Sequence, residues 1–164
     1  MSPPLRAKIL VLSDRAARGE RADRSGAAVR ERLVRAGWTV SAVEILPDEF
    51  DSIRERLVAL TDAADCDAVF TSGGTGLAAR DVTPEATRSV LEKEAPGLAE
   101  LMRAEGVKKT RLAALSRGVT GVRKGKLIVN LPGSVRGATE SLESILDLLP
   151  HAIELLKGNT AHSE

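Results

Sequence analysis

The sequence has few of the residues on which several common kinds of site depend. Of its 164 residues, one is a cysteine, Cys66, and two are histidines, His151 and His162. A single cysteine cannot form an intramolecular disulfide, and these three residues do not form a motif of the kind that binds zinc. Aromatic residues make up 2% of the chain, too few for the stacking surfaces that bind single-stranded nucleic acid. We therefore expect no disulfide, no zinc site and no nucleic-acid partner.

Long apolar runs and an excess of one charge are also missing. Residues 1–7 contain no apolar run of signal-peptide length, and no later segment approaches the roughly 20 apolar residues of a membrane span. Basic and acidic residues nearly cancel, for a net charge of +1, which disfavours electrostatic binding to nucleic acid. We therefore expect a cytoplasmic protein with no membrane partner.

The length and composition favour one domain. Hydrophobic residues make up 43% of the chain, and 164 residues is an ordinary length for one domain. A chain of this length buries enough apolar surface to form a core without disulfides or structural metals. We expect a single domain over residues 1–164, with its core at about 8–157.

Short apolar runs alternate with helical patterns along the chain. Buried strands are predicted by the runs at 8–13, 39–46 and 68–72. Apolar residues at helical spacing predict helices near 25–36, 50–60, 83–93, 97–105, 142–149 and 150–157. Two further strands, 120–123 and 126–130, flank a Lys124-Gly125 turn and predict a hairpin. This order indicates a three-layer α/β/α fold with a mostly parallel sheet and an antiparallel edge strand from the hairpin.

A glycine-rich run, TSGGTG at 71–76, directly follows a predicted buried strand. Three glycines in four positions let the backbone approach a ligand closely and direct N–H groups toward an anion. The run is not a P-loop, because no Lys-Ser/Thr pair follows at the required spacing, and it is not the dinucleotide fingerprint. Taken alone, it is equally well explained as a tight turn.

Two aspartates follow strands that end at the same edge of the sheet as this run. Asp81 lies in RDVTPE at 80–85, and Asp48 lies in LPDEF at 46–50. Each precedes a predicted helix, so the simplest alternative is stabilisation of a helix N-terminus. In parallel sheets, however, ligands bind outside the carboxyl ends of the strands. Because Mg²⁺ is typically held by one or two carboxylates plus substrate phosphates, the pattern also fits a metal-phosphate site.

Other polar residues follow strands or begin helices at this edge. Ser13-Asp14 ends the first strand, DRSG at 23–26 precedes a helix, and NLPGS at 130–134 joins the last strand to a helix. Helix capping alone explains DRSG, with Ser25 as the expected cap, and an ordinary junction explains NLPGS. Both segments also place possible phosphate donors at helix N-termini. Ser116-Arg117, before the hairpin, is a weaker candidate for a substrate contact.

Together these motifs resemble the MogA/MoaB family of molybdopterin adenylyltransferases, whose animal counterpart is the G domain of gephyrin. The resemblance covers about residues 8–157, and its most specific part is GGTG followed at fixed spacing by DVTPE. One departure is Val135, where many members have proline. The motifs that carry the resemblance are SD (13–14), DRSG (23–26), TSGGTG (71–76), RDVTPEAT (80–87), PG (96–97), LSR (115–117) and NLPGS (130–134).

The resemblance implies an α/β/α enzyme, usually trimeric, that binds molybdopterin and ATP. It would join AMP to the terminal phosphate of molybdopterin and release pyrophosphate, with a MoeA-type molybdenum-insertion protein as a possible partner. Asp48 and Asp81 match the family's catalytic acidic positions and are expected to hold Mg²⁺ through the nucleotide. The expected substrate contacts are Ser13, Asp14, Ser25, Ser72, Gly73, Gly74, Thr75, Gly76, Ser116, Asn130, Pro132, Gly133 and Ser134.

Phosphate chemistry agrees with this expectation. The second pKa of a phosphate monoester is about 6, so the attacking oxygen is already ionised at neutral pH and needs no general base. This fits a sequence without a convincing catalytic histidine. Two alternatives remain open: a CinA-like nucleotide pyrophosphatase, which shares the fold but is normally a longer chain, and a non-catalytic pterin-binding paralogue.

Overall fold

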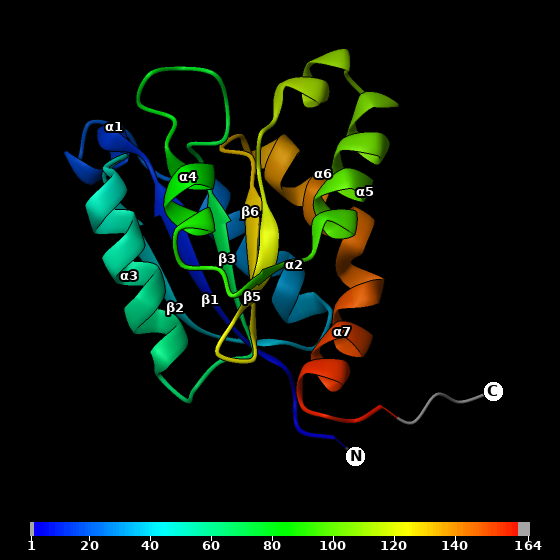
Figure 1. Cartoon of the computed structure of the whole chain (residues 1–164). Coiled ribbons are helices and arrows are strands. Elements are labelled where there is room, and N and C mark those ends of the chain that lie inside the picture. Colours follow the sequence, from blue (N-terminus) through cyan, green and yellow to red (C-terminus); the bar gives the residue numbers. More distant parts are fainter. Residues whose placement is uncertain (1, 161–164) are drawn as a thin grey trace.

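Six strands form one mixed sheet in the computed structural model, which describes residues 2–160 (Figure 1). Their order in the sheet is β2-β1-β3-β6-β5-β4. The four strands β2, β1, β3 and β6 run parallel, whereas β5 pairs antiparallel with both β6 and β4. This confirms the mostly parallel sheet with an antiparallel edge. The strands are β1 (Arg6–Leu12), β2 (Thr39–Leu46), β3 (Ala68–Ser72), β4 (Lys93–Glu94), β5 (Thr120–Arg123) and β6 (Lys126–Leu131).

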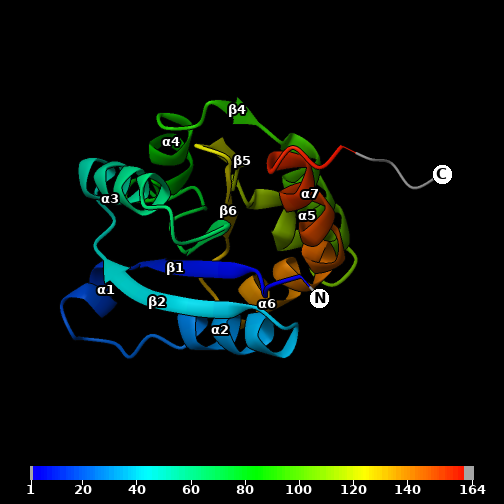
Figure 2. The ribbon, with the colours of Figure 1, turned by 90° about the horizontal axis from the view of Figure 1, so that it is seen from below.

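Helices cover both faces of this twisted sheet (Figure 2). One face packs against α3 and α4, and the other packs against α2, α5, α6 and α7. Two 3₁₀ helices, Arg111–Leu115 and Leu146–Leu148, follow α5 and α6. The α-helices are α1 (Asp14–Ala17), α2 (Ser25–Arg35), α3 (Phe50–Asp62), α4 (Thr83–Arg88), α5 (Pro96–Val107), α6 (Val135–Ile145) and α7 (Leu149–Leu156).

Alternating side chains of the central strands supply two hydrophobic cores. In β1, Ile9 and Val11 point toward α2 and α6, whereas Leu10 and Leu12 point toward α3 and α4. All four side chains are at most 3% exposed. Burial on both faces explains why residues 9–12 are continuously apolar rather than alternating in polarity.

Several predicted helix boundaries are wrong. The helix predicted near 142–149 is α6, which begins at Val135 and ends at Ile145. Two other errors have local causes. The helix predicted over 83–93 ends at Arg88, because residues 92–95 pair with β5 through Glu92 N to Val122 O (2.9 Å) and Ala95 N to Thr120 O (2.9 Å). Ser25 is the first residue of α2 rather than its cap. The carboxylate of Asp23 instead accepts from the backbone N–H groups of Ser25 (3.1 Å) and Gly26 (3.0 Å).

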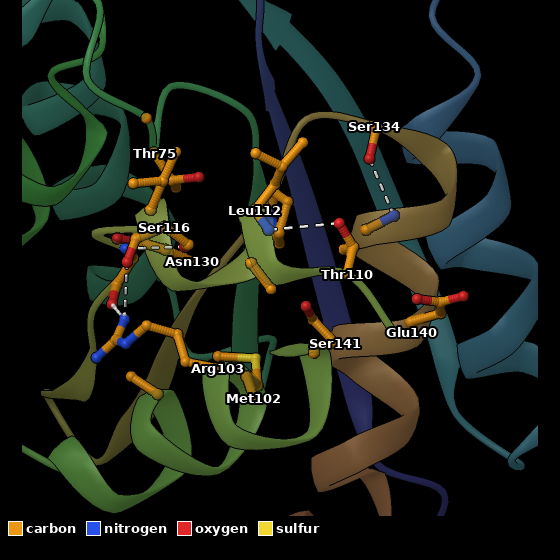
Figure 3. A pocket seen from close by; sticks show the side chains of 18 residues that line it. Thr75, Met102, Arg103, Thr110, Leu112, Ser116, Asn130, Ser134, Glu140 and Ser141 are labelled. Atoms are coloured by element: carbon orange, nitrogen blue, oxygen red, sulfur yellow. Dashed lines mark hydrogen bonds between the residues drawn. The ribbon is translucent and has the colours of Figure 1, made fainter. Parts of the chain in front are cut away.

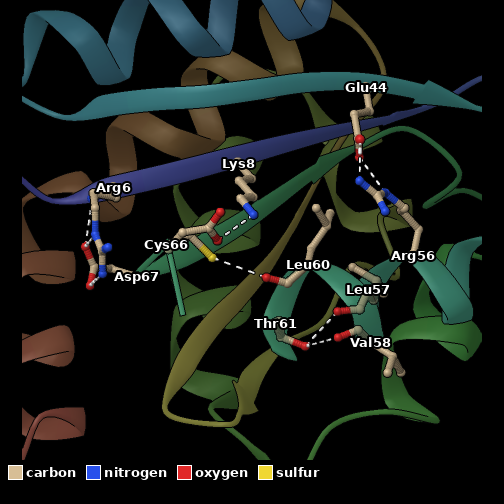
Figure 4. A network of polar contacts seen from close by, with 11 residues as sticks. Arg6, Lys8, Glu44, Arg56, Leu57, Val58, Leu60, Thr61, Cys66 and Asp67 are labelled. Atoms are coloured by element: carbon tan, nitrogen blue, oxygen red, sulfur yellow. Dashed lines mark hydrogen bonds and ion pairs between the residues drawn. The ribbon is translucent and has the colours of Figure 1, made fainter. Parts of the chain in front are cut away.

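Ion pairs close the amino-terminal end of the sheet (Figure 4). Arg6 Nε lies 3.4 Å from Asp67 Oδ2, which also accepts from Arg6 N at 2.8 Å, and Lys8 Nζ lies 2.6 Å from Asp65 Oδ1. Cys66 Sγ donates to Leu60 O at 3.5 Å, and the residue is 2% exposed, so this cysteine is part of the hydrophobic core. Within residues 2–160 we find no helix long and apolar enough to span a bilayer.

The opposite, carboxyl end of the sheet is where the connections change direction. After β1 the chain adds β2 on one side and then crosses to add β3 on the other. In open α/β sheets, this reversal leaves a crevice outside the strand ends, where ligands bind. The ends are held together by Ser13 N to Leu46 O (2.9 Å) and Gly73 N to Leu131 O (3.0 Å).

Candidate active site

A polar cavity of about 630 Å³ lies at the carboxyl ends of β1 and β3. The N-terminal residues of α2 and α6 and the loops after β1, β2, β3 and β6 form its walls. The cavity therefore brings together loops that are up to about 120 residues apart in sequence. It lies where ligands bind in open α/β sheets, outside the carboxyl ends of the strands. The expected site residues that line it are Ser13, Ser25, Asp48, Ser72, Gly73, Gly74, Asp81, Gly133 and Ser134.

The glycine-rich loop is packed too closely for side chains. Gly73 and Gly74 have φ values of 110° and 68°, in the left-handed region that glycine favours. A Cβ atom on Gly73 would lie 2.2 Å from Leu12 O, and one on Gly74 would lie 2.2 Å from Thr83 Oγ1. The tight-turn explanation is therefore sufficient for these two glycines. The same packing places their backbone on the wall of the polar cavity, where a ligand can approach it.

Asp14 and Asp48 join the ends of β1 and β2 by reciprocal hydrogen bonds. Asp14 N donates to Asp48 Oδ2 (3.1 Å), and Asp48 N donates to Asp14 Oδ1 (2.9 Å). Arg80 adds a two-point contact to Asp14, with Nε to Oδ2 at 2.9 Å and Nη2 to Oδ1 at 2.8 Å. Hydrogen bonding to Arg80 lowers the pKa of Asp14 from 3.8 to about 2. Asp14 therefore remains ionised throughout the neutral range.

Asp48 lies in a different electrostatic environment. Burial raises the pKa of its carboxyl group, and the negative charges of Asp14 and Asp81 raise it further, while the N–H group of Asp14 acts in the opposite direction. Its Oδ1 atom is buried and has no hydrogen-bond partner among residues 2–160. Asp81 Oδ2 accepts from Ala78 N at 2.9 Å. Both carboxylates line the polar cavity, close enough for the charge of Asp81 to raise the pKa of Asp48.

Neither aspartate makes a capping hydrogen bond to the helix that follows it. The residues immediately before α3 and α4 are Glu49 and Val82, and neither makes a side-chain capping hydrogen bond. Asp48 Oδ2 instead accepts from the N–H group of Asp14, the first residue of α1, and Asp81 Oδ2 accepts from the N–H group of Ala78 in its own loop. Within residues 2–160, no three His, Cys, Asp or Glu side chains cluster closely enough to hold a metal. Two carboxylates do fit a Mg²⁺ ion whose other ligands are phosphate oxygens and water.

A second cavity, of about 370 Å³, adjoins the first at Ser134 (Figure 3). Its walls come from α5, the 3₁₀ helix Arg111–Leu115, β6 and α6, with Met102 and Leu112 among its apolar side chains. A flat heterocycle can bury its faces against such a surface. The expected site residues here are Thr75, Gly76, Ser116, Asn130, Pro132 and Ser134.

Comparison with known proteins identifies the family of this chain. A model of the family described as a probable molybdopterin binding domain matches residues 8–151. The chain belongs to this family.

Individual relatives agree with that assignment. A protein named molybdopterin adenylyltransferase from Helicobacter pylori J99 is 41% identical over 155 residues, covering 92% of this chain and 87% of the relative. One of the same name from Escherichia coli K12 is 39% identical, covering 94% and 86%. The crystal structure of the molybdopterin biosynthesis enzyme MoaB from Thermus thermophilus matches with a TM-score of 0.88 at 54% identity, over 94% of this chain and 97% of that one. These relatives confirm the resemblance carried by the motifs.

Several expected contact residues of this family member use their side chains within the protein. Ser13 and Ser134 cap α1 and α6 by accepting from Ala16 N (3.2 Å) and Gly137 N (2.9 Å). Ser25 Oγ donates to Asp23 Oδ1 at 2.9 Å. A capping hydroxyl that accepts from the backbone still has its own proton to donate, so Ser13 and Ser134 remain able to bind an anion.

Asn130 is the most completely engaged of these side chains. Its Oδ1 accepts from Val119 N (3.1 Å), and its Nδ2 donates to Thr71 Oγ1 (3.0 Å) and Thr87 Oγ1 (3.0 Å). The residue is 1% exposed. Its amide group therefore ties β6 to β3 and α4 beneath the apolar cavity.

Three arginines at the site were missed or undervalued by sequence reasoning. Arg21 and Arg24 line the polar cavity, and within residues 2–160 neither forms a salt bridge. Arg117 braces the glycine-rich segment by donating to Gly76 O (2.7 Å) and Asp81 O (2.8 Å). The DRSG and LSR motifs contained Arg24 and Arg117, but motif position alone does not distinguish a cavity-lining charge from a solvated or bracing one.

The contact between Arg80 and Asp14 predicts an acid-shifted titration. Because the folded-state pKa of Asp14, about 2, lies below the ordinary 3.8, its stabilising contribution is complete above the ordinary value and is lost as pH falls toward 2. Carboxyl ¹³C NMR should show Asp14 titrating near pH 2 in the parent and closer to its ordinary value in Arg80→Ala. The matched variant Arg80→Lys keeps the charge but not the two-point contact, and should lie between them. A parent Asp14 that titrates near pH 4 would contradict this geometry.

Proposed function

We propose that this protein transfers the adenylyl group of Mg-ATP to the terminal phosphate of molybdopterin, releasing pyrophosphate. The observation that carries the proposal is the junction at Ser134 of a polar cavity containing two carboxylates and an apolar cavity of suitable size for a heterocycle. The names of the relatives supply the substrate class. The architecture supports it because phosphates and flat rings need these two kinds of surface side by side.

The polar cavity suits the phosphates of both substrates. Arg21 and Arg24 supply positive charge, while the N-terminus of α6 directs backbone N–H groups toward an anion. Asp48 and Asp81 would hold Mg²⁺ through the nucleotide. The ion, when bound, neutralises the repulsion between phosphate groups. We assign the apolar cavity beside Met102 to a ring system of a substrate.

The reaction then needs alignment more than proton transfer. An ionised oxygen of the terminal phosphate of molybdopterin attacks the α-phosphorus of ATP. A new P–O bond forms, the α–β phosphoanhydride bond breaks, and the electron pair leaves with pyrophosphate. The protein's contribution is to hold the two phosphates in line and to stabilise the negative charge that leaves, which is the usual task in phosphoryl and nucleotidyl transfer.

The organisation around this activity is also part of the proposal. We propose that the chain works as one domain, with residues 1–164 as its extent, and assembles as the homotrimer that the family resemblance implies. Exposed apolar side chains on the edge strand β2, Val43 (41%) and Ile45 (42%), support burial against another copy. Cytoplasmic location and transfer of the product to a MoeA-type protein follow from the same resemblance.

A pyrophosphatase of the CinA type is the enzymatic alternative, and substrate dependence separates the two. We expect little pyrophosphate release from Mg-ATP alone and a sharp increase when molybdopterin is added, because the pterin phosphate is an anchored nucleophile and water is not. Mass spectrometry should detect adenylylated molybdopterin. In parallel, ADP-ribose should yield no AMP. Pterin-independent cleavage of ADP-ribose, without pterin-stimulated use of ATP, would assign the chain to the alternative.

The two carboxylates predict a second, sharper result. Asp48→Asn and Asp81→Asn remove metal-positioning charge, which should cost several kcal/mol of barrier, a rate loss of roughly a hundredfold or more. Asp147→Asn makes the same chemical change at an exposed position in the 3₁₀ helix Leu146–Leu148 and should keep parent activity. Turnover is measured as adenylylated pterin formed, and folding as the thermal midpoint. Near-parent turnover by both site variants would remove the assignment of Asp48 and Asp81 as the catalytic residues.

A further inference from the structure

Two buried polar atoms remain without partners beside the glycine-rich loop. Within residues 2–160, Asp48 Oδ1 and Thr83 Oγ1 are the buried side-chain nitrogen or oxygen atoms that have no hydrogen-bond partner. Thr83 is 0% exposed and is the first residue of α4. Buried polar groups are nearly always paired in native proteins, so two adjacent exceptions need an explanation.

The two atoms face the same small space. A Cβ atom on Gly74 would lie 2.2 Å from Thr83 Oγ1 and 3.0 Å from Asp48 Oδ1. Thr83 Oγ1 and Asp48 Oδ1 therefore lie on either side of one small space. A direct hydrogen bond or one bridging water molecule can connect the two oxygens. The absence of a side chain at Gly74 keeps this space open. Thr83 N also donates to Gly74 O at 3.2 Å, which fixes the backbone of Thr83 relative to the loop.

The chemistry of the two groups is complementary. A carboxylate only accepts hydrogen bonds, whereas a threonine hydroxyl rotates and can donate. The other oxygen of Asp48, Oδ2, already accepts from Asp14 N at 3.1 Å. A bond from Thr83 to Oδ1 would therefore fix the carboxylate at both oxygens and prevent it from rotating about its own axis. Because Oδ1 is buried, Oδ2 is then the oxygen that Asp48 presents to the polar cavity.

We infer that Thr83 is a positioning residue whose hydroxyl group, directly or through one water molecule, holds Asp48 in the orientation that receives the metal–nucleotide complex. The inference rests on the proposed function for its reaction, but its geometry concerns only residues of this chain. Thr83 itself lines neither cavity. Groups of this kind behind a metal ligand typically change metal affinity or activity by roughly 10- to 100-fold.

The test compares variants that separate the hydroxyl group from the methyl group of Thr83. Thr83→Val keeps the shape and removes the hydroxyl. Thr83→Ser and Thr83→Ala both lack the methyl group, and only the serine keeps the hydroxyl. Calorimetry with α,β-methylene-ATP, with Mg²⁺ or with EDTA, measures binding without turnover. Steady-state assays with Mg-ATP and molybdopterin give kcat and KM, and thermal midpoints report folding.

We expect Thr83→Val and Thr83→Ala to weaken Mg²⁺-dependent binding of the analogue and to lower kcat by roughly 10- to 100-fold. Thr83→Ser should behave as the parent does. The KM for molybdopterin and the binding measured in EDTA should not change, since neither depends on the orientation of Asp48. If Thr83→Val does not fold, the serine–alanine pair alone decides.

Equal behaviour of the serine and alanine variants would overturn the inference, because the hydroxyl group would then have no separate effect. Parent-like binding and kcat in a folded Thr83→Val would overturn it as well. Failure of the proposed function gives a different result. The parent would form no adenylylated molybdopterin, while the hydroxyl-dependent, Mg²⁺-dependent binding of the analogue would still be present.

Discussion

The close packing of Gly73 and Gly74 is the constraint on which the whole site depends. Gly73 lies against the carbonyl group at the end of β1 and donates to the carbonyl of Leu131 at the end of β6 (3.0 Å). Gly74 lies against Thr83 and Asp48, and a Cβ on Gly133 would come within 3.2 Å of Gly73 Cα. Four segments thus meet at two residues that have no side chain. Any larger residue would separate the strand ends and with them the walls of the polar cavity.

The charges around this packing are arranged by sign. The two-point contact with Arg80 neutralises Asp14. Within residues 2–160, Asp48 and Asp81 form no salt bridge. Two carboxylates that repel each other are costly to place near an anionic ligand unless a cation joins them. Arg21 and Arg24 contribute the opposite charge elsewhere on the same wall. This arrangement is suited to a metal–triphosphate complex, which presents both signs at once.

Sequence reasoning predicted the parts that depend on local pattern. Residues 39–46 and 68–72 are strands with the predicted bounds, and the Lys124-Gly125 hairpin turn has the positive φ values, 52° and 73°, that such a turn requires. The two-residue β4 was missed because exposed Lys93 and Glu94 have no apolar pattern and become a strand only by pairing with β5.

In the candidate site, too, sequence predicted the features set by local pattern and missed those set by tertiary contact. The strand-end rule and the family motifs were enough to place Asp48, Asp81 and the glycine-rich run at one edge of the sheet. The reciprocal bonds between Asp14 and Asp48 depend on the register of β1 against β2, which sequence pattern does not contain. The apolar cavity depends on the 3₁₀ helix Arg111–Leu115, whose sequence resembles an ordinary polar loop at its start. Features made by tertiary contact were therefore the ones that sequence did not predict.

We propose that the polar cavity takes the metal–triphosphate and the apolar cavity takes a ring. A crystal structure with Mn²⁺ and α,β-methylene-ATP can test this, because the anomalous signal of manganese locates the metal independently of the nucleotide. We expect an anomalous peak beside the carboxylates of Asp48 and Asp81, with the triphosphate between Gly74 and Ser134. A triphosphate bound beside Met102 and Leu112, or a metal remote from both aspartates, would contradict it.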